Sequence, residues 1–74
     1  MPKLPVVSGK EVVKALTKTG YEVDHQKGSH VTLRRIEYPH RRVTVPMHKE
    51  IAKGTLKAIL TEAGLSVDEF IELL

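Results

Sequence analysis

The sequence lacks cysteine, and it has no long apolar stretch. Without cysteine there can be no disulfide, no thiolate nucleophile and no cysteine-ligated zinc site. No apolar run approaches about 18 residues, and no basic start precedes a hydrophobic block, so neither a membrane span nor a signal peptide is expected. We therefore expect a soluble, cytoplasmic protein that has no membrane partner.

The length of the chain, 74 residues, predicts a single domain over residues 1–74. A chain this short buries only roughly 60% of the surface that it exposes when unfolded, which is too little for two independent cores. A large internal substrate pocket is not expected for the same reason. Any chemistry should take place on the surface or in a shallow groove, on a substrate that is large or supplies part of the reaction machinery.

Charge is distributed unevenly along the chain, whose net charge is +3. Residues 1–24 have a balance of +1, and residues 54–74 have a balance of −3. Residues 25–53 have a balance of +5 and contain all four histidines. A concentrated basic segment favours a surface that binds polyanions, with phosphate groups as the natural partner. The alternative is a solvated pair of strands whose charges block pairing at the sheet edge.

Three segments carry helix signals. The first begins at a Ser-x-x-Glu capping box, residues 8–11, and can end at Gly20. The second opens at residues 54–55 and has Gly64 as its C-terminal stop. The third begins at another capping box, residues 66–69, and its apolar residues could dock on the domain or on a partner chain.

Between the first two helices the hydrophobic period changes to two, which is typical of strands. A first strand starts at Tyr21, and residues 27–28 can form a tight hairpin turn. A second strand covers residues 30–34, and a third runs over residues 42–45 and ends at Pro46.

These elements predict an α+β fold in the order helix, three-stranded antiparallel sheet, helix, followed by a short C-terminal helix. That order is the one used by double-stranded-RNA-binding domains, although the order of elements alone is a weak guide to function. An antiparallel sheet with its helices on one face leaves the second face open to solvent.

His30 is the first candidate for chemistry. If Val31 and Leu33 set the core face of the second strand, alternation places His30, Thr32 and Arg34 on the open face. An imidazole titrates at about pH 6.5, so it can take and give a proton at cellular pH. RNA supplies its own nucleophile, the 2′-hydroxyl, so its cleavage needs a proton acceptor or donor and positive charge near the phosphate. On the residues alone, His30 is either a catalytic group or an ordinary surface histidine.

The residues around His30 are suited to holding a phosphate group. The side chains of Lys27, Arg34 and Arg35 carry positive charge, and Ser29 or backbone amides of the turn can donate hydrogen bonds. Gly28 allows a phosphate to approach the backbone closely.

The other three histidines are weaker candidates. His25 shares the strand parity of Tyr21 and Val23, which predicts a partly buried or edge position. His40 lies in a turn and should be solvated, whereas His48 follows the third strand and either approaches the active face or supports the loop. No two histidines have the spacing of a helical metal site, so neither a metal ion nor another cofactor is expected.

Several short motifs, taken together and in order, resemble the HicA-type mRNA interferase toxins of bacterial toxin-antitoxin systems. The motifs are Ser8-Gly9-Lys10-Glu11, Gly28-Ser29-His30, Val45-Pro46-Met47-His48, Gly54-Thr55-Leu56-Lys57-Ala58-Ile59-Leu60 and Ala63-Gly64-Leu65-Ser66-Val67-Asp68-Glu69-Phe70. The resemblance covers nearly the whole chain, and this conjunction is far more specific than any one motif.

The resemblance implies a double-stranded-RNA-binding-like fold, cleavage of messenger RNA without a metal, and a HicB-type antitoxin that blocks the toxin. It implies that His30 is catalytic and that Gly28 and Ser29 shape its turn. The sequence thus predicts a toxin endoribonuclease in which His30 is a general acid or base. Two alternatives are an RNA-binding domain without chemistry and a protein-interaction module without RNA activity.

Overall fold

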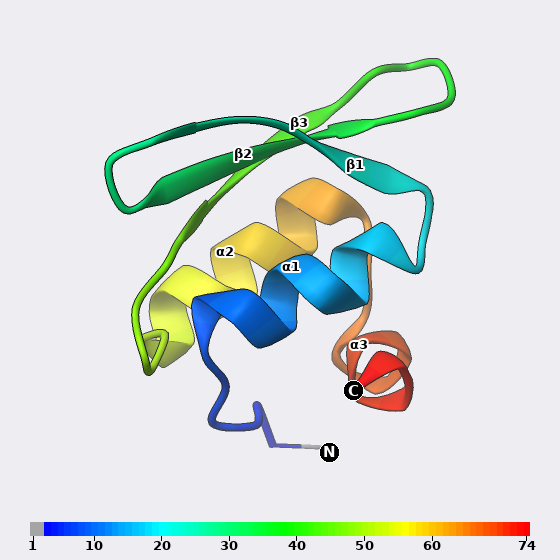
Figure 1. Ribbon diagram of the computed structural model, residues 1–74. Helices are drawn as coiled ribbons and strands as arrows, with labels where there is room; N and C mark the ends of the chain where they lie inside the picture. The colour runs from blue at the N-terminus through cyan, green and yellow to red at the C-terminus, as the bar shows by residue number, and fades with distance from the viewer. Residues whose placement is uncertain (1–2) are drawn as a thin grey trace.

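The computed structural model describes residues 3–74 and contains three helices and one antiparallel sheet (Figure 1). The sheet order is β1-β2-β3, and both pairs are antiparallel. The α+β order predicted from the sequence is confirmed. The elements are α1 (Gly9–Thr17), β1 (Tyr21–Lys27), β2 (His30–Arg35), β3 (Arg42–Pro46), α2 (Lys53–Ala63) and α3 (Val67–Leu73).

The sheet has one covered and one open face, because α1 and α2 lie next to each other beneath the same side of it (Figure 1). Val31 and Leu33 of β2 are buried against these helices, as are Val43 and Val45 of β3. The residues between them point the other way, as expected for strands whose side chains alternate. This alternation fixes which side chains the open face presents. The other buried hydrophobic residues are Val7, Val12, Ala15, Leu16, Tyr21, Ile51, Leu56, Ile59, Leu60, Ala63 and Phe70.

Both predicted capping boxes and the predicted stop at Gly64 are present, whereas α1 ends at Thr17 with Lys18 as its C-cap, two residues before the predicted stop at Gly20. Ser8 and Glu11 form a reciprocal capping box at α1, and Ser66 and Glu69 form one at α3. Gly64 ends α2 in the left-handed conformation, with φ of 76°. These bonds satisfy backbone groups that a helix end leaves without partners, so these three helix boundaries have a local cause in the sequence. The start of α2 differs, because its N-cap residue, Ala52, makes no side-chain hydrogen bond.

The short helix α3 docks on its own domain. The side chain of Phe70 is fully buried in the core, and the Lys18 ammonium donates a hydrogen bond of 2.9 Å to the carbonyl oxygen of Leu73. Ile71 and Leu74 keep part of their surface exposed. The sequence left open whether this helix docks on its own domain or on a partner chain, and the structure shows it docked on its own domain. No helix within residues 3–74 is long and apolar enough to cross a membrane.

Backbone hydrogen bonds join three segments at one end of the sheet. The Met47 amide donates to the carbonyl oxygen of Ser29 over 2.6 Å, which ties the loop after β3 to the β1–β2 turn. The Gly9 amide donates to the carbonyl oxygen of His48 over 2.9 Å, which ties the same loop to the start of α1. The position of the β1–β2 turn is therefore fixed by main-chain hydrogen bonds to the loop after β3.

Gly9 is needed because the loop packs directly on its Cα atom. A Cβ at this position would collide with the Pro46 carbonyl oxygen and would lie 2.8 Å from the Cα of Met47. We expect Gly9→Ala to lower the free energy of unfolding by about 1–3 kcal/mol, measured by urea denaturation. The matched control is Gly54→Ala in α2, where nothing lies within 4 Å of the added methyl group. The control should be unchanged or stabilised by up to about 1 kcal/mol, and equal stabilities of the two variants would contradict this view of Gly9.

Candidate functional site

The turn between β1 and β2 presents His30 at the end of the sheet. Lys27 and His30 are the last paired residues, so Gly28 and Ser29 form a two-residue turn. Gly28 has a φ of 59°, while Ser29 has no positive φ, a pattern that matches the type II′ turn favoured in tight hairpins. Glycine is required here because side chains disfavour a positive φ. Space is not the reason, since an added Cβ would meet nothing within 4 Å.

His30 lies on the open face, as its strand parity predicts. Its register partners are Lys27 on β1 and Pro46 on β3, and its side chain is exposed while the next residue, Val31, is buried. Lys27 is therefore the residue directly opposite His30 across the β1–β2 pair. Thr32 and Arg34 follow on the same face. A catalytic role for His30 stays a prediction at this point, but the exposure of its side chain is a structural fact.

Of the two positions predicted for His25, the partly buried one is wrong, whereas the edge position is confirmed because β1 is an outer strand of the sheet. The register between β1 and β2 shifts between Val23 and His25, so Asp24 is an extra residue in a β-bulge. The bulge reverses the parity of the residues after it, and His25 becomes the register partner of Thr32. Its side chain is 61% exposed. A second histidine thus joins the open face, which periodicity alone could not reveal.

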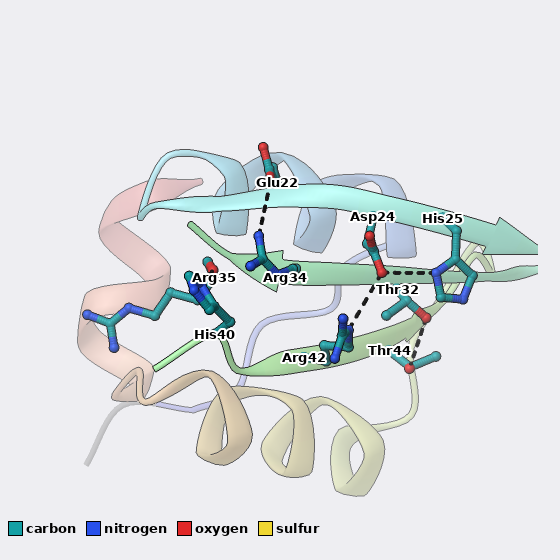
Figure 2. A network of polar contacts seen from close by, with 9 residues as sticks. All are labelled: Glu22, Asp24, His25, Thr32, Arg34, Arg35, His40, Arg42 and Thr44. Carbon is teal, nitrogen blue, oxygen red and sulfur yellow. Dashed lines mark hydrogen bonds and ion pairs between the residues drawn. The ribbon is translucent and has the colours of Figure 1, made fainter. Parts of the chain in front are cut away.

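Asp24 on β1 reaches across the open face to β3 (Figure 2). Its Oδ2 atom lies 3.1 Å from Nδ1 of His25 and 3.6 Å from Nε of Arg42 on β3. Beside it, Arg34 pairs with Glu22 at 3.8 Å, and the hydroxyls of Thr32 and Thr44 lie 3.3 Å apart. Sequence reasoning missed this network because the pairing depends on strand register. The charges of two open-face arginines are partly offset by carboxylates.

The hydrogen bond from His25, followed by the charges of His25 and Arg42, holds the pKa of Asp24 below its ordinary value of 3.8. Asp24 is consequently ionised throughout the pH range in which an imidazole titrates. A permanent carboxylate beside an imidazole favours donation of its Nδ1 hydrogen to the carboxylate and leaves Nε2 free toward solvent.

Arg35 does not share the face of His30 and Arg34. It is the register partner of the buried Tyr21, and it lines a pocket of about 330 Å³ on the helix side of the sheet. Arg41, Gly64 and other residues near the end of α2 line the same pocket. In Figure 2 the Arg35 side chain points away from Arg34 and toward α3. Of the three cations proposed to hold phosphate, the structure brings together Lys27 and Arg34 on one face and separates Arg35 from them.

The two remaining histidines lie in loops outside the strands. His40 is exposed in the loop between β2 and β3, where its Nδ1 lies 3.1 Å from the carbonyl oxygen of Arg35. His48 is exposed beside the start of α1 and lines a groove of about 280 Å³ with Lys10 and Lys49, so both of its predicted roles stay open. No group of three potential metal ligands occurs among residues 3–74.

Comparison with protein families gives one match. The family model described as the HicA toxin of bacterial toxin-antitoxin matches residues 9–65, which is most of the chain. The matched span includes α1, all three strands, α2 and the turn that carries His30. No curated protein matched the chain.

The Asp24–His25 contact can be tested by titration. We expect NMR to show the Asp24 carboxyl titrating below 3.8, with its midpoint rising in His25→Ala. Because this folded-state pKa is depressed, any stability from the contact is present above the ordinary value and is lost as the pH falls through the folded-state pKa. His40→Ala is the matched control and should leave the Asp24 midpoint unchanged. An Asp24 midpoint at or above 3.8 in the unmodified protein would contradict the contact.

Proposed function

The chain belongs to the HicA toxin family of bacterial toxin-antitoxin systems, and from that premise we propose that it is an endoribonuclease that cuts messenger RNA with His30 as general acid or base. The observation that carries the proposal is the position of His30. It is exposed on the open sheet face, next to the hairpin turn and opposite Lys27. A long nucleic acid can reach this position without entering a pocket.

The proposed chemistry needs little from the protein. The RNA 2′-hydroxyl attacks the adjacent phosphorus, a side chain accepts or donates the proton, and a cation offsets charge on the phosphate oxygens. His30 supplies the proton transfer and Lys27 the charge, while Gly28 and Ser29 shape the turn that holds both. We propose that no metal ion or other cofactor takes part.

We further propose that the RNA backbone follows the open face from Lys27 toward Arg34. Phosphate contacts position a nucleic acid without reading its sequence, and flexible cations can make them over a shallow surface. Arg35 is left out of this path because it lies on the helix side of the sheet. The open face is also the surface that a HicB-type antitoxin would have to cover in order to inhibit cleavage.

The first test is His30→Ala. We expect loss of messenger RNA cleavage and of growth inhibition, with a melting temperature within about 1–3 °C of the unmodified protein, because the replaced side chain is exposed. The control variant His40→Ala, which replaces an exposed histidine in a loop, should cleave normally.

Cleavage should persist with a chelator and should stop when the 2′-hydroxyl at the cut position is removed. Full activity of His30→Ala would refute the catalytic assignment, and salt-sensitive binding without cleavage by the unmodified protein would favour the RNA-binding alternative.

The second test concerns the path of the RNA. In an inactive His30→Ala background, Lys27→Ala should weaken RNA binding similarly for different sequences and reduce the salt slope of log affinity by about 1. Lys57→Ala on α2, an exposed lysine beneath the covered face, is the matched control and should change neither quantity. Equal losses for the two lysine variants would contradict binding along the open face.

A further inference from the structure

The β-bulge in β1 creates a pair of histidines on the open face. His25 lies opposite Thr32, and His30 is the residue two positions before Thr32 on the same strand. His25 and His30 are therefore diagonal neighbours across an antiparallel pair, a relation that puts side chains about 7–8 Å apart or slightly closer. Without the bulge, His25 would point toward the helices.

The orientation of the His25 ring is constrained from one side. Nδ1 lies 3.1 Å from Oδ2 of Asp24, and Asp24 is itself held by Arg42 from the far strand. A neutral imidazole that donates Nδ1–H to a carboxylate has an unprotonated Nε2, and the same carboxylate stabilises the imidazolium that forms when Nε2 takes a proton. His30, by contrast, makes no side-chain hydrogen bond among the contacts found in residues 3–74.

We propose that His25 is the general base of RNA cleavage, positioned by Asp24, and that His30 on the same face is the general acid. This inference rests on the proposed function and assigns the two proton-transfer roles within it. His25 thereby becomes a catalytic residue, and Asp24 becomes a positioning residue that acts through it. Lys27 lies at the same end of the face, because it is the register partner of His30 and follows His25 by two residues on β1.

The two roles account for all atoms of the step. Nε2 of His25 takes the proton of the 2′-hydroxyl as that oxygen bonds to phosphorus. His30 gives a proton to the 5′-oxygen as the bond between phosphorus and that oxygen breaks. The products are a 2′,3′-cyclic phosphate and a 5′-hydroxyl. The attacking and leaving oxygens lie roughly in line on opposite sides of phosphorus, so two imidazoles at the diagonal spacing can each serve one of them.

The charged groups facing His25 come from all three strands. Asp24 and Lys27 are on β1, His30 is on β2, and Arg42 reaches Asp24 from β3. The uncharged hydroxyls of Thr32 and Thr44 lie between them. Asp24 is the one carboxylate in contact with the imidazole among the described residues, and its removal also frees Arg42 from its ion pair.

The experiment measures the rate of messenger RNA cleavage against pH for the full chain. The unmodified protein should give a bell-shaped profile. His25→Ala should cleave about 10²- to 10⁴-fold more slowly and lose the acidic-side inflection. Asp24→Asn should retain that inflection but shift it to lower pH, because the charge that stabilises the imidazolium is gone. His40→Ala, an exposed histidine that also makes one Nδ1 contact, should keep the normal rate and profile.

Two results would overturn the proposal: a His25→Ala profile that keeps both inflections at a normal rate, or one that loses only the alkaline side. Circular dichroism of each variant separates loss of fold from loss of chemistry, and added imidazole should restore part of the rate to folded His25→Ala. Absence of rescue in that folded variant would also count against a catalytic role. If the unmodified protein itself does not cleave RNA, the proposed function fails, which is distinct from a failure confined to His25.

Discussion

Burial of the inner face of β2 is the constraint from which the arrangement of the surface follows. Val31 and Leu33 occupy the core between the sheet and the two long helices, so the alternate residues of the central strand must face solvent. Slipping that strand by one residue would turn His30 inward and expose the core residues. The hydrophobic effect thus orients a polar side chain that contributes nothing to the core. The polar residues of β2 that alternate with these apolar residues face solvent because the apolar residues are buried.

Much of this arrangement could be predicted from local sequence signals. The capping boxes at Ser8 and Ser66 set helix starts, Gly28 set the turn, and alternation oriented His30, because each depends on residues close together in the chain. The face of the sheet on which His25 lies could not be predicted, since a bulge breaks the period without a signature of its own. The Asp24–Arg42 pair joins outer strands and appears only when the register of both pairs is known.

The electrostatics also differ from a simple count of charges. Residues 25–53 are strongly basic in sequence, but Arg34 and Arg42 lie near carboxylates of β1, and Arg35 lies on the covered side. Exposed ion pairs of this kind contribute little to stability. Their effect on the face is to offset part of the positive charge of Arg34 and Arg42, while Lys27 remains outside these ion pairs at the end where His30 lies.

The hydrogen bonds behind the hairpin turn have a consequence for how the sequence can change. The bonds from Met47 to Ser29 and from Gly9 to His48 use backbone atoms only, so they do not depend on which side chains occupy those loop positions. The exposed side chains of Ser29 and His48 can therefore change while the turn keeps its place. Position 9 is the exception, because a single methyl group there pushes on the same backbone that supports the turn. Among the residues that make these bonds, Gly9 is therefore the one whose replacement would disturb the backbone itself.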